Sequence, residues 1–187
     1  EHDSWQTSYD LFQNKHLHHI PIIDKNGCVK GVKFIDELLH NKKKQNWVIL
    51  MAGGIGSRLS PLTDDQPKPL LKVGNKPLLE TIVENFIKQG FYQFYISVSY
   101  KAEMIETHFG NGTRWGVNIQ YLRENKRRGT AGALSLLPEI PKNSLLVMNG
   151  DLVTKVNFHQ LLDFHNGHRS KATMCVKEHD IKVPFGV

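Results

Sequence analysis

The chain has 187 residues, of which 40% are hydrophobic and 22% are charged, and its formal net charge is +6. This length allows one well-buried domain with a smaller piece attached, and the composition is that of a folded globular protein. The basic residues are not interleaved with aromatic ones as on a nucleic-acid-binding face, so we expect small anionic ligands and no nucleic acid.

Cysteine spacing and hydropathy limit the kinds of metal or disulfide site and the cellular locations that we expect. The two cysteines, Cys28 and Cys175, lie far apart and have no metal-ligand spacing, which argues against a disulfide framework and a zinc site. No apolar run approaches the ~20 residues of a membrane span, and the N-terminal segment lacks the basic start and apolar core of a signal peptide. We therefore expect a cytoplasmic protein that has no membrane partner.

The N-terminal part of the chain carries a hairpin pattern. An apolar strand over 20–23, a turn, and a second strand over 28–34 lead into a short helix over 36–39. The run HHIPIIDKNGCVKGVKFIDELL resembles the end of a CBS motif, a regulatory module whose repeats pair and often bind adenine nucleotides. We assign residues 1–41 to a partial module of this type. The module's usual Thr-x-x-Asp is absent, so an adenine nucleotide partner and a plain hairpin both stay open.

Residues 42–46 are polar and indicate a linker, and from residue 47 onward short apolar segments alternate with helical patterns. The expected strands are 47–51, 93–98, 117–122, 145–149 and 172–176. The expected helices are 77–90, 101–109, 130–137 and 158–165. This alternation predicts an α/β domain over 47–187, with a Rossmann-like, mainly parallel sheet covered by helices on both faces. In such sheets ligands bind beyond the carboxyl ends of the strands.

The first expected strand of this domain runs into a glycine-rich loop, MAGGIGSRLSPLTDDQPKPL. Gly53, Gly54 and Gly56 allow backbone amides to turn toward an anion. Arg58 adds a fork of donors suited to phosphate, and Lys68 stands between two prolines that stiffen the backbone. The spacing matches neither the P-loop nor the dinucleotide fingerprint. These residues alone leave two interpretations open, a polyphosphate cradle and a glycine-rich turn with solvated basic residues.

Several motifs in order resemble one enzyme family. The run GGIGSRLSPLT followed by PKPLLKVGNKPLLE is similar to the signature of the sugar-phosphate nucleotidylyltransferases, which join a nucleoside triphosphate to a sugar 1-phosphate and release pyrophosphate. The segment LRENKRRGTAGAL resembles the family's nucleobase segment, and LLVMNGDL resembles its strand that ends in a metal-binding aspartate. Residues 47–187 follow the family's order of motifs, so the resemblance implies a nucleotide-diphospho-sugar transferase type of fold.

The resemblance also implies roles for individual residues. Arg58 and Lys68 are the expected catalytic residues, Arg58 on the β- and γ-phosphates that leave and Lys68 on the phosphates that react. Asp151 would bind Mg²⁺, which prefers one or two carboxylates together with phosphate oxygens, although by itself a Gly-Asp pair after a strand is more typical of a turn or cap. The implied nucleotide-binding residues are Ala52, Gly53, Gly54, Gly56, Ser57, Glu124, Gly129 and Thr130.

The GTAGAL segment and the CBS-like piece favour a guanylyltransferase that acts on mannose 1-phosphate or on a related hexose or hexosamine 1-phosphate. The family's later sugar-phosphate lysine and second metal aspartate are not in this chain. We therefore expect a domain truncated at its C-terminus, with substrate binding and weak or no turnover. The alternative is a non-catalytic regulatory protein that senses nucleotides. The nucleobase, the sugar and a homo-oligomeric state are left open by the sequence.

Overall fold

The computed structural model describes residues 17, 19–34, 43–126, 128–168 and 170–178. The chain separates into two compact units, Glu1–Thr154 and Lys155–Val187. Among the described residues, no helix combines the length and the apolar character that are needed to cross a membrane.

The N-terminal strands form the expected hairpin. β1 (His19–Ile23) and β2 (Val29–Phe34) are antiparallel, and the carboxylate of Asp24 closes the turn by accepting two backbone N–H groups, each at 2.9 Å. Large apolar side chains on both strands are exposed, because a two-stranded piece cannot bury a core of its own. The helix expected over 36–39 lies outside the described residues.

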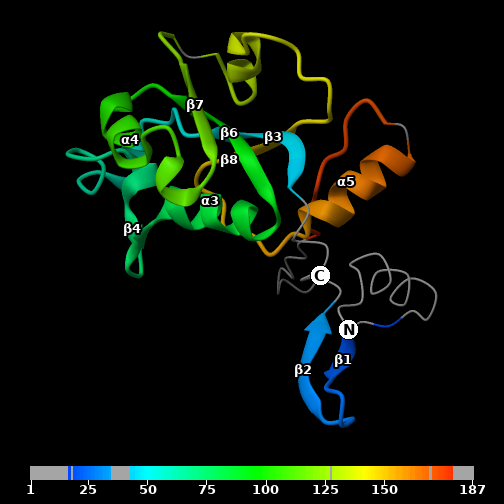
Figure 1. The fold of residues 1–187 in the computed structure, drawn as a ribbon. Coiled ribbons are helices and arrows are strands. Elements are labelled where there is room, and N and C mark those ends of the chain that lie inside the picture. Colours follow the sequence, from blue (N-terminus) through cyan, green and yellow to red (C-terminus); the bar gives the residue numbers. More distant parts are fainter. Residues whose placement is uncertain (1–16, 18, 35–42, 127, 169, 179–187) are drawn as a thin grey trace, which may run out of the picture. The chain divides into compact units, whose positions relative to one another are not determined.

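Four parallel strands form the central sheet (Figure 1). They are β3 (Lys44–Met51), β6 (Phe91–Val98), β7 (Asn118–Arg123) and β8 (Leu146–Asn149). Their order across the sheet is β7-β6-β3-β8, so the chain moves outward on one side of β3 and then returns to its other side. In open α/β sheets, ligands bind at such a reversal, beyond the carboxyl ends of the strands. Four of the five strands expected in the domain are confirmed.

β3 begins earlier than expected. Lys44 pairs with Phe91 of β6, and its backbone N–H donates to the carbonyl oxygen of Gly90 at 2.9 Å. Residues 44–46, expected in the linker over 42–46, therefore belong to the sheet. Hydropathy did not indicate this start, because the fully buried residues of β3 are confined to its second half.

The fifth expected strand is wrong. Residues 172–176 have no strand conformation and no strand partner among the described residues. Met174 and Val176 are each 81% exposed. Apolar and β-branched residues favour a strand only where neighbouring residues pack against them, so this segment stays irregular.

Two helices cover one face of the sheet. α3 (Leu78–Lys88) and α4 (Ala102–Phe109) lie within the ranges expected for them. Phe86 of α3 packs edge-on against Phe91 and Phe94 of β6, with ring centroids 5.6 and 6.2 Å apart. This packing fixes β6, and with it the loop that follows β6 at the carboxyl edge of the sheet.

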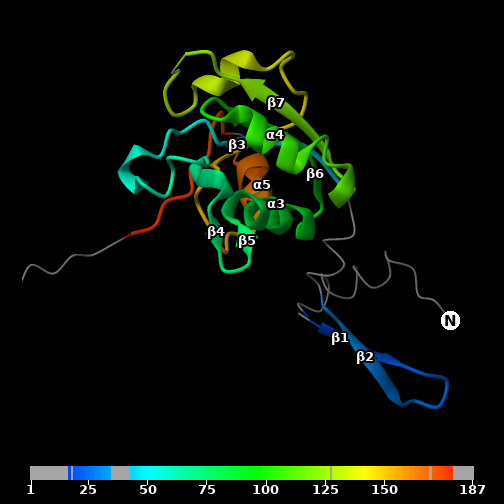
Figure 2. The ribbon, with the colours of Figure 1, turned by 90° about the vertical axis from the view of Figure 1, so that its left-hand side faces the viewer.

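A 3-10 helix covers the opposite face. η4 (Gly132–Leu136) belongs to a buried cluster that contains Ala133, Ile49, Tyr95 and Leu122. Figure 2 shows this yellow-green segment and α3 on opposite sides of the sheet, so helical segments cover both faces as expected. The α-helix expected over 130–137 is shorter and of the 3-10 type, because Gly132 within this range lowers its helical propensity.

The carboxyl end of β7 is tied to α4. The guanidinium of Arg123 donates to the carboxylate of Glu106 at 2.8 and 2.5 Å. The hydroxyl of Tyr121 donates to the carbonyl oxygen of Gly110 at 2.6 Å. Burial, and then the nearby charge of Glu106, raise the pKa of Tyr121 to about 12, so this hydroxyl remains a donor at neutral pH. These contacts fix the strand end from which Glu124 emerges.

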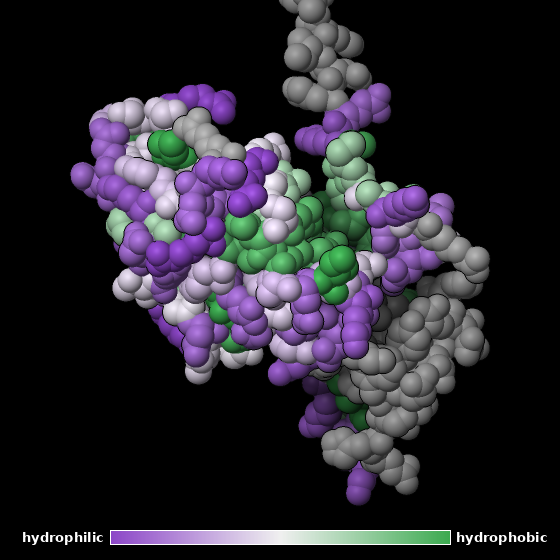
Figure 3. All heavy atoms as spheres, turned by 90° about the horizontal axis from the view of Figure 1, so that it is seen from above, coloured by the Kyte–Doolittle hydropathy of each residue, from purple (hydrophilic) through white to green (hydrophobic). Residues whose placement is uncertain are grey.

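The β8 side of the sheet is less covered. Val147 of β8 is 45% exposed, and Leu152 and Val153, which follow the strand, are 51% and 59% exposed. On the face that is seen from above, Figure 3 shows a hydrophobic area next to hydrophilic surface. The two sides of β3 therefore differ, since β6 is almost fully buried.

The second unit contains α5 (Phe158–Gly167), which confirms the helix expected over 158–165. The side chain of Asn157 caps this helix by accepting the backbone N–H groups of His159 and Gln160 at 3.0 and 3.1 Å. The connections of the first unit contain η1 (Ser57–Leu59), η2 (Lys68–Leu70), β4 (Lys72–Val73), β5 (Lys76–Pro77) and η3 (Thr113–Trp115).

Candidate functional site

The candidate site lies at the carboxyl edge of the sheet. Met51, the last residue of β3, pairs with Ser97 of β6 and with Asn149 of β8, so the loops that follow these strands begin side by side. The glycine loop follows β3, Glu124 follows β7, and Asp151 follows β8. The parallel topology therefore gathers residues that lie far apart in the sequence.

Two backbone hydrogen bonds anchor the start of the glycine loop. The N–H of Ala52 donates to the carbonyl oxygen of Ser97, and the N–H of Gly150 donates to the carbonyl oxygen of Met51, both at 2.9 Å. Ala52 is buried, so it positions the loop through its backbone and does not expose its side chain to a ligand. A Cβ at Gly150 would lie 3.0 Å from the Met51 oxygen. Gly150, which the sequence did not single out, thus permits the close approach of the segment that carries Asp151.

A residue in the left-handed region turns the glycine loop back on itself. Gly56 has a φ of 74°, and its carbonyl oxygen accepts the hydroxyl of Thr63 at 3.0 Å. A Cβ here would lie 3.0 Å from Cγ2 of Thr63 and 3.2 Å from Cβ of Lys68. Both the φ angle and the packing therefore require glycine. Gly54 is exposed and has open space where a Cβ would point, so a ligand can reach this part of the loop.

The basic end of the loop is open to solvent. Ser57 and Arg58 lie on η1 and are exposed. Within the described parts of the chain, no carboxylate forms an ion pair with the guanidinium of Arg58. A guanidinium carries five N–H donors in a planar fork that matches phosphate oxygens. Arg58 is therefore available to an anionic ligand.

Lys68 and Asp151 form an ion pair. Nζ of Lys68 donates to Oδ2 of Asp151 at 2.5 Å, although the two residues are 83 positions apart. Pro67 and Pro69 are buried on either side of Lys68, which fixes the backbone there. The side chains of Lys68 and Asp151 are 35% and 39% exposed, so a ligand can reach both. The expected catalytic lysine thus lies beside the expected metal-binding aspartate. The alternative role of Asp151 as a helix cap does not apply to α5, because Asn157 caps that helix.

Glu124 lies against the start of the glycine loop. Its backbone N–H donates to the carbonyl oxygen of Val98 at 2.8 Å, and its carbonyl oxygen accepts the hydroxyl of Ser99 at 3.0 Å. The buried hydroxyl of Ser97 donates to Oε1 of its carboxylate. A Cβ at Gly53 would lie 3.2 Å from the same Oε1. Two expected nucleotide-binding residues, Gly53 and Glu124, are therefore neighbours.

Gly129 and Thr130 are exposed just before η4. In the described chain, no hydrogen bond joins either residue to the glycine loop. The nearby Arg128 donates to the hydroxyl of Ser135 at 3.2 Å, which holds the segment against η4. The expected contact of Gly129 and Thr130 with a nucleobase stays a prediction.

Two residues that follow β6 brace the glycine loop and were missed by the sequence analysis. The hydroxyl of Tyr100 and the ammonium of Lys101 both donate to the carbonyl oxygen of Asp64, at 3.2 and 2.6 Å. Asp64 lies between Arg58 and Lys68 in the chain. Lys101 thereby adds a positive charge beside the loop that carries the two expected catalytic residues. The sequence around it, SYK after an apolar strand, gave no signal of this contact.

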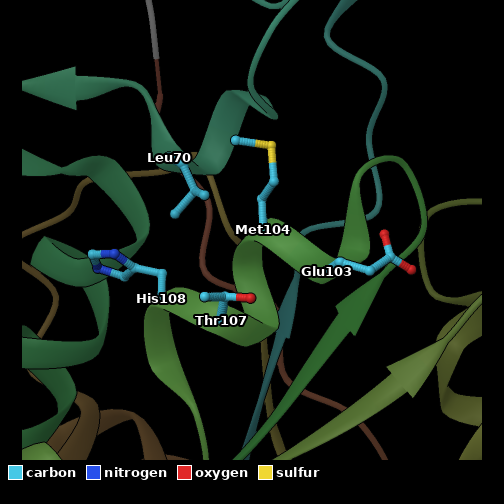
Figure 4. A pocket seen from close by; sticks show the side chains of 5 residues that line it. All are labelled: Leu70, Glu103, Met104, Thr107 and His108. Carbon is cyan, nitrogen blue, oxygen red and sulfur yellow. The ribbon is translucent and has the colours of Figure 1, made fainter.

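A cavity of about 410 Å³ contains none of the expected site residues. The side chains that line it come from η2 and α4 and are Leu70, Glu103, Met104, Thr107 and His108 (Figure 4). Nε2 of His108 lies 2.8 Å from Oε2 of the buried Glu80. The lining lacks the cluster of cationic donors that a polyphosphate requires, so this cavity is not the candidate site.

The sequence was compared with known proteins. Residues 47–187 match the family described as nucleotidyl transferase. The chain is 34% identical over 143 residues to the mannose-1-phosphate guanyltransferase of Saccharomyces cerevisiae, covering 74% of this chain and 40% of that protein. It is 32% identical over 127 residues to the mannose-1-phosphate guanylyltransferase of Mycobacterium tuberculosis, covering 67% and 35%. It is 34% identical over 130 residues to the D-glycero-alpha-D-manno-heptose 1-phosphate guanylyltransferase of Aneurinibacillus thermoaerophilus, covering 69% and 56%.

Solved structures of related proteins have a similar fold. HddC from Yersinia pseudotuberculosis superposes with a TM-score of 0.58 at 28% identity, covering 64% of this chain and 54% of that chain. The same protein complexed with GMP-PN gives a TM-score of 0.55 at 27% identity over the same shares. The parallel sheet with helical segments on both faces is therefore the α/β fold of nucleotide-diphospho-sugar transferases. The chain spans less than two thirds of the length of each relative named above.

Proposed function

This chain belongs to the nucleotidyl transferase family, and we propose that it binds a nucleoside triphosphate, preferably GTP, for transfer of the nucleotide to a hexose or hexosamine 1-phosphate. The products are an NDP-sugar and pyrophosphate. The observation that carries this proposal is the gathering of the glycine loop, Glu124 and the Lys68–Asp151 pair at the carboxyl edge of one sheet. The names of the relatives support guanine as the base and favour mannose 1-phosphate as the acceptor.

The proposed reaction is a substitution at phosphorus. An oxygen of the sugar phosphate attacks the α-phosphorus in line, and the bond from the α-phosphorus to its bridging oxygen breaks. The electron pair stays on that oxygen, and pyrophosphate leaves. Arg58 binds the β- and γ-phosphates as they take up this charge, and Lys68 binds oxygens at the reacting phosphate. Such a transfer requires mainly positioning and charge neutralisation, which exposed basic groups beside a glycine loop can supply.

Asp151 is the proposed protein ligand of Mg²⁺. Among the described residues, no three His, Cys, Asp or Glu side chains form a ready-made metal site. Mg²⁺ nevertheless fits the residues present, because it takes one or two protein carboxylates and completes its shell with phosphate oxygens and water. When bound, the ion supplies positive charge beside the phosphates. Lys68 lies beside the Asp151 carboxylate, so Asp151 would hold the ion where the Lys68 ammonium could contact the same phosphates.

Glu124 supports the choice of guanine on chemical grounds. The Watson–Crick edge of guanine presents two adjacent donors, N1–H and the N2 amino group, and an ionised carboxylate accepts both. Uracil and thymine flank their single N–H with two carbonyl oxygens, and adenine and cytosine place an acceptor nitrogen beside the amino group. A carboxylate repels each of these acceptors. Glu124 beside the glycine loop therefore suits guanine best.

Pyrophosphate release by the complete gene product tests the proposal. GTP, ATP, UTP, CTP and dTTP are each combined with mannose, glucose and N-acetylglucosamine 1-phosphates in the presence of Mg²⁺. We expect the highest kcat/KM for GTP with mannose 1-phosphate. No release with any pair contradicts the transferase proposal. If a triphosphate still binds under those conditions, the result supports the alternative of a nucleotide-sensing regulatory protein.

A further inference from the structure

We infer that Ser97 is a positioning residue for nucleobase selection, because its buried hydroxyl holds the Glu124 carboxylate in the orientation that recognises guanine. The inference rests on the nucleotide site proposed above. Ser97 lies near the carboxyl end of β6, pairs with Met51 and Leu122 in the neighbouring strands, and has an exposed fraction of 0%. A fully buried hydroxyl in an apolar strand requires a hydrogen-bond partner, and here that partner is a carboxylate.

Three hydrogen bonds from described residues fix Glu124, and they act on different parts of the residue. The bonds with Val98 and Ser99 hold its backbone N–H and carbonyl oxygen. Within the described part of the chain, its carboxylate is held by the bond from Ser97 alone, through Oε1. Gly53 of the glycine loop lies close to the same oxygen, because a Cβ at this position would be 3.2 Å from Oε1. The backbone bonds thus set where the side chain begins, and Ser97 sets the direction in which its oxygens point.

The direction of the carboxylate matters because guanine offers two donors side by side. Each carboxylate oxygen has two acceptor positions, and the Ser97 hydroxyl occupies one of them on Oε1. The remaining positions can accept N1–H and the N2 amino group together only when the carboxylate plane faces the edge of the base. Without the Ser97 donor, the carboxylate can rotate about its terminal bond and lose one of the two contacts. A site built to pair with specific donors rejects bases that lack them, and this rejection weakens when the site is loosely held.

Equilibrium binding of GTP, UTP and ATP in the presence of Mg²⁺ tests this role, using the complete gene product and its Ser97→Ala variant. We expect the Kd for GTP to rise roughly tenfold in Ser97→Ala, as for the loss of a hydrogen bond to a charged group. The Kd values for UTP and ATP should change less than about twofold, since neither base uses both carboxylate oxygens. Tyr92→Phe is the matched control, because it removes a hydroxyl of β6 that bonds to Gln45 at the opposite end of the strand.

A double-mutant cycle with Glu124→Gln separates positioning from a purely structural role. If Ser97 acts through the carboxylate, Ser97→Ala changes the ratio of GTP to UTP affinity in the wild-type background and leaves it unchanged when Glu124→Gln is already present. An equal loss of affinity for all three triphosphates, or an unchanged ratio in Ser97→Ala, overturns the inference alone. A wild-type protein that binds no triphosphate overturns the proposed function and this inference with it. Far-UV circular dichroism of each variant verifies that the chain is folded.

Discussion

The two sides of the candidate site are built differently. On the side proposed for the base, Glu124 is fixed by hydrogen bonds from the sheet and has a buried hydroxyl beneath its carboxylate. On the side proposed for the phosphates, Arg58, Lys68 and Asp151 carry charge and are partly or largely exposed. The proposed base side is therefore organised by internal hydrogen bonds, whereas the charged groups of the proposed phosphate side are accessible to solvent. Substitutions on the phosphate side should change turnover more than folding, and substitutions in the loop between the two sides should change folding.

The largest effect is expected for turnover on the phosphate side. Arg58→Ala and Lys68→Ala each remove a positive charge that, in the proposed reaction, stabilises the phosphates as pyrophosphate forms. In the complete gene product, we expect kcat for pyrophosphate release to fall by about 10²- to 10³-fold in each variant. Lys72→Ala is the control, because Lys72 is an exposed lysine on β4. Steady-state kinetics provide the measurement, and a kcat within about threefold of wild type in either variant contradicts the assigned role.

An intermediate effect on stability is expected at the turn of the glycine loop. Gly56→Ala introduces a side chain at a φ of 74° and against Thr63 and Lys68, so the free energy of unfolding should fall by about 2 to 3 kcal/mol. Gly74→Ala is a matched control with a φ of 71° and no neighbour within 4 Å, and it should cost only about 1 kcal/mol. Urea unfolding gives both values. Equal losses in the two variants would show that packing around Gly56 contributes nothing.

The smallest effect on folding is expected for the ion pair. Because the Lys68 and Asp151 side chains are 35% and 39% exposed, Asp151→Asn should change the free energy of unfolding by less than about 1 kcal/mol. The same variant should lose the part of GTP affinity that depends on Mg²⁺. Urea unfolding without ligand and nucleotide binding with and without Mg²⁺ measure the two quantities. Full retention of the Mg²⁺ dependence argues against Asp151 as the metal ligand.

The sequence predicted the parts of the fold that follow from local pattern. Apolar segments that alternate with helical ones gave four strands, the helices α3, α4 and α5, and the N-terminal hairpin. The pattern was wrong over 172–176, because hydropathy does not reveal whether a neighbouring strand is present. It also placed the start of β3 too late, because the first residues of that strand are polar. The cytoplasmic location and the CBS-type module remain predictions, and a homo-oligomeric state stays open.

The expected site residues were predicted from motifs, but their contacts depend on tertiary structure. The pairing of Lys68 with Asp151 and the approach of Gly53 to Glu124 follow from the order of the strands, which no local pattern contains. Lys101 was missed for the same reason. Ser97 did leave a signal, since it is the one residue with an aliphatic hydroxyl within the run FYISV. A lone polar residue in a strand that is otherwise buried indicates a specific partner.

Thermal unfolding with a panel of triphosphates tests the central claim, that these loops form a nucleoside triphosphate site. A ligand that binds only the folded state stabilises it, by about 2.7 kcal/mol at a concentration one hundred times its Kd. With Mg²⁺ present, we predict that GTP raises the Tm by several degrees and raises it more than ATP, UTP, CTP or dTTP does. A Tm that no triphosphate changes would contradict the account.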